Sequence, residues 1–415
     1  MKALFFSIML VLAAVTFSYG QGTTLSEADR KQIIEQLRKE ILDSLKGAPS
    51  EVILTKEDSV KKAKENQWKG HVEFGAYVEA YYIYDFNQPA NHDRPPFVYS
   101  YNRHNEISVD LAYAKISYIA PRLRANVALM AGTYANANLA AEPGVLKNIL
   151  EANAGINLSA KKQVWLDAGV FASHIGFESA RGADCWNMTR SILADNSPYY
   201  ESGVKLTYTS DNGKFLASGL ILNGWQRIQR VSGNSLPAFG WQIQGNPTSK
   251  ILINSSSFIG SDDPDSSRRM RYFHNLYVIY NVTDKLGFTL GFDAGMQQKA
   301  KGSKDYNFWY SPVFIARYAF CDKLAASARF EYYADPNGVI IATGTPNGFA
   351  TFGYSLNLDV TPVSFAMIRF EGRLFQSRQD EIFTDKSGSA TKLDPFIGVT
   401  FALSFGYSPP LINGH

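Results

Sequence analysis

The sequence predicts an all-β protein: a transmembrane, antiparallel, up-and-down β-barrel of about sixteen strands that follows a short N-terminal amphipathic helix. Three observations lead to this prediction. The chain begins with a segment typical of export, its alternating strands are longer than those of soluble proteins, and the connections between strands alternate between short and long.

The first twenty residues indicate the compartment. Lys2 precedes an apolar run that ends at Phe17, and small residues stand at positions 18 and 20, before a cleavage point at Gln21. This order is typical of a secretory signal peptide, and the run is shorter than the roughly 20 residues that a membrane-spanning helix needs. We therefore expect residues 1–20 to be a signal peptide.

Residues 21–70 differ from everything that follows them. Apolar residues recur at helical spacing among charged ones, at Leu25, Ile34, Leu37, Ile41 and Leu45. This spacing predicts an amphipathic helix over residues 25–47, which a solvated linker follows. The apolar stripe is long enough to bind a periplasmic partner or to form a short coiled coil.

From His71 to Phe405 the apolar period changes to two. In the first strand, apolar residues on one face alternate with mostly polar residues over positions 72–82, and the pattern returns at 286–297, 324–333 and 397–405. Soluble strands have a typical length of about 5 to 6 residues, whereas membrane-spanning strands need about 9 to 11. The length of these strands favours a membrane barrel over residues 71–405, with residues 406–415 as a C-terminal tail.

The connections between the predicted strands give the strand count. Seven are short and suit tight turns: near Pro121, then at 160–161, 210–213, 246–249, 282–284, 321–323 and 361–364. Eight are longer and polar: 85–104, 135–148, 173–198, 226–237, 261–270, 298–306, 334–349 and 376–394. Fifteen connections make sixteen strands, and in bacterial outer-membrane barrels the long loops face the cell exterior. A soluble β-sandwich or propeller does not predict this alternation.

Composition and motifs exclude several classes of function. Lys+Arg 41 against Asp+Glu 38 is nearly balanced, which argues against nucleic acid as a partner, and two cysteines exclude a disulfide scaffold. Ser173 and His174 are adjacent, so on a strand they would point to opposite faces and could not form a catalytic dyad. Asp262, Asp263 and Asp265 could hold a divalent cation, but the glycine and the distal glutamate of an EF-hand loop are missing, so a solvated loop is favoured. We expect no enzyme activity, no catalytic residue, no cofactor and no bound metal.

Several segments of the barrel region look familiar. Residues 173–179 (SHIGFES), 196–200 (NSPYY), 222–226 (LNGWQ) and 268–274 (RRMRYFH) resemble the OmpL-like β-barrel porins of Bacteroidetes-type bacteria, and the resemblance continues through residues 340–348. The resemblance implies an outer-membrane pore and supplies no catalytic or substrate residues.

The polar phase of the strands should line the lumen. On the early strands it places carboxylates inward, at Glu73, Glu79, Asp110, Glu151, Asp167 and Glu201. On the later strands it places arginines inward with Glu371 among them, at Arg317, Arg329, Arg369 and Arg373. Two interpretations stay open: a transverse field that orients charged solutes, or ion pairs that stiffen the wall.

The loop 173–198 is the third long one. In general sixteen-stranded porins the loop between strands 5 and 6 folds into the lumen and narrows it, and by analogy we expect the same here. That loop would bring five polar or aromatic residues to a constriction: Arg181, Asp184, Trp186, Arg190 and Asp195.

The function that the sequence favours is passive diffusion of small hydrophilic solutes or ions through a porin in the bacterial outer membrane. The alternatives are a plugged structural or attachment barrel and, less favoured, an outer-membrane lipid hydrolase. The expected partners are outer-membrane lipid and lipopolysaccharide, the solutes themselves, a homotrimer as a candidate assembly, and a periplasmic partner bound through residues 25–47.

Overall fold

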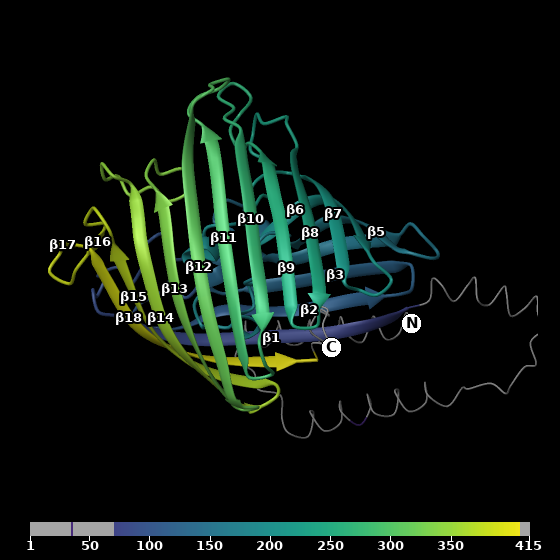
Figure 1. The fold of residues 1–415 in the computed structure, drawn as a ribbon, viewed down its shortest axis with the longest axis horizontal. Coiled ribbons are helices and arrows are strands. Elements are labelled where there is room, and N and C mark those ends of the chain that lie inside the picture. The colour runs from purple at the N-terminus through teal and green to yellow at the C-terminus, as the bar shows by residue number, and fades with distance from the viewer. Residues whose placement is uncertain (1–34, 36–69, 407–415) are drawn as a thin grey trace, which may run out of the picture. The chain divides into compact units, whose positions relative to one another are not determined.

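The computed structural model describes residue 35 and residues 70–406. The predicted signal peptide, the helix 25–47 as a whole, the linker up to residue 69 and the tail from residue 407 lie outside the described residues. Within residues 70–406, sixteen antiparallel strands close into one barrel, as the sequence predicts (Figure 1).

The barrel strands follow one another around the wall in chain order, and the last pairs with the first. The first eight are β1 (His71–Asp85), β2 (Ile107–Ile119), β3 (Leu123–Ala131), β4 (Ile149–Asn157), β5 (Gln163–Ala172), β6 (Tyr200–Thr209), β7 (Phe215–Leu222) and β8 (Ala238–Thr248). The other eight are β9 (Ile251–Gly260), β10 (Arg271–Asn281), β11 (Leu286–Gln298), β12 (Tyr306–Cys321), β13 (Leu324–Asp335), β14 (Phe349–Val363), β15 (Ala366–Ser377) and β18 (Leu393–Phe405).

The connections alternate as predicted, with seven tight turns at one end of the barrel and eight long loops at the other. We name the long loops L1 (86–106), L2 (132–148), L3 (173–199), L4 (223–237), L5 (261–270), L6 (299–305), L7 (336–348) and L8 (378–392). L2 contains α4 (Thr133–Asn138) and the 3-10 helix η1 (Gly144–Asn148), and L8 contains the small hairpin of β16 (Phe383–Thr384) and β17 (Ala390–Thr391). No helix among the described residues is long and apolar enough to span a membrane.

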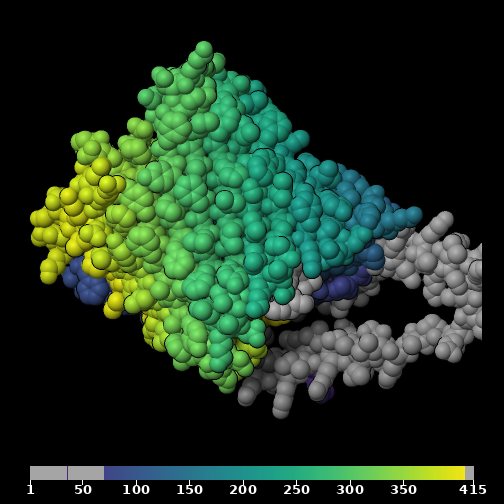
Figure 2. Space-filling model, viewed as in Figure 1, coloured from purple at the N-terminus to yellow at the C-terminus, as the bar shows by residue number. Residues whose placement is uncertain are grey.

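The two faces of the barrel wall differ in the way that a membrane requires. Outward side chains are apolar and exposed, as at Leu290 and Leu356, which are 57% and 72% exposed. Figure 2 shows one side of this wall, on which strands β9 to β14 form a continuous surface. Inward side chains are mostly polar, because they face the lumen and not lipid.

One irregularity of the sequence pattern has a structural cause. The alternation in residues 107–118 breaks phase, and the register between β1 and β2 shifts between Glu79 and Ala80. Asp110 is the extra residue of this bulge, since Ala80 pairs with Val109 and Glu79 with Leu111. Beyond the bulge the alternation resumes with Lys115 on the inner face.

Candidate functional site

L3 lies inside the barrel and forms the centre of the candidate site. Most of its side chains are buried, although it connects two strands at their loop ends. Two short turns, η2 (Gly182–Asp184) and α5 (Ile192–Asp195), interrupt an irregular backbone. Such a backbone cannot satisfy its own N–H and C=O groups. The inner wall of the barrel provides the partners.

Three wall arginines donate hydrogen bonds to carbonyl groups of L3. The bonds, 2.6 to 3.0 Å long, run from Arg329 to Thr189, from Arg369 to Gly182 and Asn187, and from Arg373 to Arg190. The three arginine side chains are at most 1% exposed. Hydrogen bonds from a charged donor are roughly twice as strong as neutral ones, so these arginines fix the path of L3.

Two wall glutamates accept hydrogen bonds from N–H groups of the same loop. Glu331 accepts from the Ile192 amide at 2.6 Å, and Glu371 accepts from the Thr189 amide at 2.6 Å. Arg329 lies 3.2 Å from Glu331 and 3.1 Å from Glu371, so the buried carboxylates are paired. We call the inner faces of β13, β14 and β15 the anchor wall.

The predicted acidic residues of β1 and β2 lie on the other side of the same loop. Glu79 and Asp110 are fully buried, and the Tyr101 amide of L1 donates to Asp110 at 2.8 Å. Gly182 of L3 approaches so closely that a Cβ atom there would lie 2.3 Å from a Glu79 carboxylate oxygen. A residue other than glycine would therefore force the Glu79 carboxylate and the Tyr101 hydroxyl to move. L3 thus contacts both Glu79 of β1 and the arginines of the anchor wall.

The structure also places the five residues expected at the constriction. Arg190 and Asp195 are buried within the packed loop, and burial raises the pKa of Asp195 to about 6. The Trp186 carbonyl accepts a hydrogen bond from Ser327 at 2.7 Å. Arg181 and Asp184 pair with each other at the edge of a cavity.

The cavity, of about 320 Å³, lies between L3 and the part of the wall opposite the anchor wall. We call this part, the inner faces of β2, β4 and β8 to β10, the open wall. Its side chains at the cavity are polar, aromatic or aliphatic and include Tyr113, Lys115, Glu151, Gln244, Leu252 and Tyr277. Lys115 and Glu151 form an ion pair of 2.9 Å whose side chains are 18% and 22% exposed. The expected inward residue Glu151 therefore lies at the cavity.

The remaining predicted inward residues form separate pairs. Asp167 accepts from Arg124 at 2.6 Å, and Glu201 lies 2.8 Å from a ring nitrogen of His174. Glu73, near the turn end of β1, has a side chain that is 40% exposed. The side chain of Arg317 is 33% exposed and lies 3.9 Å from Asp359. Asp167 and Glu73 do not contact the L3 network, whereas Glu201 bonds to His174 of L3 and Arg317 shares Asp359 with Arg369.

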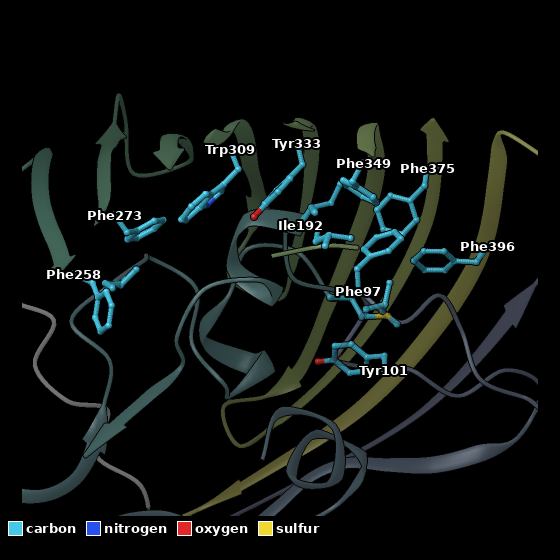
Figure 3. Close-up of a cluster of buried hydrophobic side chains, with 14 of the residues drawn as sticks. Phe97, Tyr101, Ile192, Phe258, Phe273, Trp309, Tyr333, Phe349, Phe375 and Phe396 are labelled. Carbon is cyan, nitrogen blue, oxygen red and sulfur yellow. The ribbon is translucent and has the colours of Figure 1, made fainter. Parts of the chain in front are cut away.

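Sequence reasoning missed an inward arc of aromatic side chains at the loop ends of seven strands. The arc consists of Phe258, Phe273, Trp309, Tyr333, Phe349, Phe375 and Phe396 (Figure 3). Phe97 of L1 and Ile192 of L3 pack against it. The sequence does contain a signal for this arc. In each of these strands an aromatic residue occupies an inward position near the long loop, where the alternation predicts a polar residue. These rings explain why L1 and L3 pack inward, since an apolar surface in the lumen favours apolar cover.

The arrangement gives no support to hydrolase chemistry at His174. One ring nitrogen faces Glu201, and the other lies 2.8 Å from the Ser257 carbonyl oxygen. The Ser173 hydroxyl instead accepts the Ile175 amide at 3.1 Å. Within the described barrel, Ser173 and His174 therefore form no dyad.

The three aspartates of L5 have protein partners. Asp262 accepts the Trp225 amide at 2.9 Å, and Asp263 pairs with Arg269 at 2.9 Å, which lowers the pKa of that carboxyl. Asp265 pairs with Arg268. The described residues contain no cluster of three or more side chains that could hold a metal ion.

Cys185 and Cys321 are free thiols. Cys185 is buried in L3, and Cys321 lies at the turn end of β12. The topology therefore separates them by the height of the barrel, as the sequence predicts.

Comparison with known proteins identifies the family of the chain and supports the fold. The sequence profile of the family described as "Putative beta-barrel porin-2, OmpL-like" matches residues 71–408. Among solved structures, the anion-selective porin from Comamonas acidovorans is similar with a TM-score of 0.53 at 9% identity, covering 81% of this chain and 100% of that one. OmpT of Vibrio cholerae, an outer membrane protein solved in a trimer form, has a TM-score of 0.52 at 10% identity, covering 81% and 99%. A search of curated protein sequences gives no significant match.

Proposed function

Because this chain belongs to the family of OmpL-like β-barrel porins, we propose that it is an outer-membrane pore through which small hydrophilic solutes or ions diffuse passively. A barrel of sixteen strands is wide enough to hold an aqueous channel. The polar inner face and the apolar outer face of the wall suit that role. The solutes move down their own gradients, so the pore needs no cofactor.

The route that we propose runs between L3 and the open wall. One observation carries this proposal: buried charged groups bond the middle of L3 to the anchor wall, whereas a cavity lies between the loop and part of the open wall. Toward the open wall, the first residues of the loop form contacts with neutral groups, from His174 to the Ser257 carbonyl and from the Gly176 amide to Asn275. Lys115 and Glu151 of the wall, with Arg181 and Asp184 of the loop, are then the charged groups that a solute meets. In this proposal the arginines of the anchor wall position L3, and they do not form a field across open water.

The test is the single-channel current of the detergent-purified, heat-modifiable protein in a planar bilayer with a salt gradient. The proposal predicts stepwise ohmic openings. Because the cavity carries both signs of charge in close pairs, it predicts only weak ion selectivity. A folded barrel that inserts and stays silent would refute the diffusion pore.

The aromatic arc favours a second candidate function, a plugged structural or attachment barrel. L1, L3, L7 and L8 all contribute apolar side chains to the packing against this arc. A barrel closed in this way would conduct nothing while still supporting the envelope. The same bilayer measurement separates the two functions, because only the pore predicts current.

The proposed channel is not an enzyme, and the hydrogen bonds of His174 support this. A phospholipase assay of the pure protein should show no turnover above background. Turnover that His174→Ala abolishes would contradict the proposal.

The assembly and processing that we propose extend beyond the described barrel. A signal peptide over residues 1–20 is removed. Residues 21–70 then lie in the periplasm, where residues 25–47 can bind a partner. Residues 71–405 form the barrel, and residues 406–415 follow as a tail. The trimer form of OmpT supports a homotrimer. The segments quoted from the sequence support an origin in Bacteroidetes-type bacteria.

A further inference from the structure

Polar side chains interrupt the apolar outer wall on the strands from β8 to β12. Ser257 of β9 pairs with Trp241 of β8 and with His274 of β10. The same row continues through Ala294 of β11 to Tyr310 of β12. Residues opposite each other in neighbouring strands point to the same face, so all five face outward.

These residues belong to an outward-facing hollow of about 570 Å³. Two of its lining residues have small side chains, Ser257 and Ala294, and they stand on either side of His274 in the row. Larger apolar and aromatic side chains surround them, among them Ile259, Tyr272, Phe292 and Phe308. Its volume is within the range of about 300 to 1,000 Å³ that small-molecule sites have.

The polar groups of this hollow are incompletely bonded. Ser257 is only 5% exposed, and its hydroxyl finds no hydrogen-bond partner among the described residues. One ring nitrogen of His274 lies 3.2 Å from the Ser255 hydroxyl, and the ring packs on Trp241 at 5.5 Å between centroids. A buried hydroxyl without a partner has a desolvation cost that no hydrogen bond offsets. On a wall that faces lipid, water cannot remove that cost.

The position of the hollow along the strands identifies the leaflet. Ser257 lies three residues before the end of β9 (260 − 257), and His274 three residues after the start of β10 (274 − 271). The long loop L5 connects the end of β9 to the start of β10. At about 3.3 Å per residue the hollow lies roughly 10 Å from the loop end of the barrel, in the half that faces the cell exterior.

We propose that this hollow binds one acyl chain of an outer-leaflet lipid, and that the chain carries a hydroxyl group close to its head, as the 3-hydroxyacyl chains of lipopolysaccharide do. The surrounding apolar side chains contact the methylene groups. The Ser257 hydroxyl and the free ring nitrogen of His274 bond the hydroxyl of the lipid. This inference depends on the outward face of the wall and is independent of whether the lumen conducts.

The same wall contains a control. A second outward hollow of about 830 Å³ lies over β12 to β15 and β18, and its lining includes the small residues Ala316, Ala328 and Gly372. These residues offer no side-chain donor or acceptor, so this hollow should bind acyl chains without regard to a hydroxyl. Ala328→Phe fills it and leaves the polar hollow unchanged.

The experiment compares two probes that differ by one oxygen atom, 3-hydroxytetradecanoic acid and tetradecanoic acid. The detergent-purified full chain is incubated with equal amounts of both, and native mass spectrometry counts what each folded barrel retains. The wild-type protein should retain the hydroxylated chain roughly fivefold more, the effect of one additional net hydrogen bond. Ser257→Ala and His274→Phe should remove this preference, and Ala328→Phe should keep it.

Equal retention of the two probes by the wild-type protein would overturn the proposal. So would a preference that survives both Ser257→Ala and His274→Phe. Heat-modifiable mobility shows that each variant is folded, and Ser255→Ala, which removes only the partner of His274, provides a milder second variant with a reduced preference. If these substitutions instead dissociate an oligomer without changing lipid retention, the face is a contact between copies of the chain and the lipid site is wrong.

Discussion

The anchor wall and the open wall have similar sequence patterns and different surroundings. Both present charged side chains in the inward phase of long strands. On the anchor wall, Arg369 and Arg373 are buried against the backbone of L3. On the open wall, Lys115 and Glu151 are partly exposed at a cavity.

The difference shows what decides the role of a charge inside a barrel. A charge that bonds loop backbone is desolvated and fixed, so its contribution is structural. A charge beside open space keeps water and can act on a passing ion. Burial by L3, and not the identity of the side chain, therefore separates the two groups of inward residues.

Thiol labelling should give the largest contrast between a residue held by L3 and one outside it. Burial raises the pKa of Cys185 to about 11, whereas Cys321 is exposed. At pH 7.5 less than about one Cys185 thiol in a thousand is ionised, and the thiolate is the reactive form. A maleimide should modify Cys321 at least about 100-fold faster than Cys185 in the folded barrel, as read by mass spectrometry of the peptides. Similar rates would mean that L3 is not packed on the anchor wall.

Removal of one anchor should release L3. Arg369→Met takes away the donors to Gly182 and Asn187 and leaves Asp359 with a weaker partner. Breaking a buried ion pair costs about 3 to 5 kcal/mol, so we expect the loop to become sensitive to protease and the conductance to rise. Arg317→Met is the matched control, since Arg317 lies 3.9 Å from the same Asp359 and its side chain is 33% exposed. Equal protease resistance of the two variants would contradict the anchoring role.

Asp195 should make the packing of L3 dependent on pH. Burial raises its pKa from 3.8 to about 6, so between these values the native protein binds more protons than the unfolded chain does. Stability from this group is therefore fully present below pH 3.8 and decreases as the pH rises through about 6. Asp195→Asn should raise the free energy of unfolding by about 1 to 3 kcal/mol at pH 7.5 and by much less at pH 4. Urea unfolding at both pH values measures this, and a variant that is destabilised equally at both would contradict the account.

Substitution of the charged residues on the open wall should change the ion selectivity of the pore, and this effect should be smaller than those above. Lys115→Gln leaves Glu151 unpaired at the cavity and should shift the reversal potential toward cations, by roughly twofold in the permeability ratio. Glu151→Gln should shift it toward anions. The double variant Lys115→Glu with Glu151→Lys keeps the net charge of the pair, so its reversal potential should equal that of the wild-type protein. Reversal potentials that stay constant across all three variants would exclude the open wall as the route.

The fold could be predicted from the sequence almost entirely, because the membrane imposes a length, a period and an alternation of loops on each strand. The alternation in residues 107–118 breaks phase, and the structure identifies Asp110 as the bulge that causes it. The inward direction of Arg369 and Glu151 could also be predicted, because period two fixes the face.

The separation of these two residues into different roles could not be predicted. It depends on which wall L3 covers, and that depends on contacts between residues far apart in the chain, such as Arg369 with Gly182. The aromatic arc was also missed, because rings such as Phe375 and Trp309 stand in a phase that the barrel pattern assigns to polar residues. Each is unremarkable in its own strand, and only the closed barrel brings them together.

The central claim is that solutes pass between L3 and the open wall. The most direct test places one cysteine on each wall in a Cys321→Ser background, Gln244→Cys at the cavity and Ser355→Cys beneath L3, where the Asn187 side chain donates to Ser355 at 3.2 Å. A charged methanethiosulfonate is then added while the single-channel current is recorded. The account predicts a stepwise loss of current for Gln244→Cys and none for Ser355→Cys. Loss of current at position 355 with none at position 244 would contradict it.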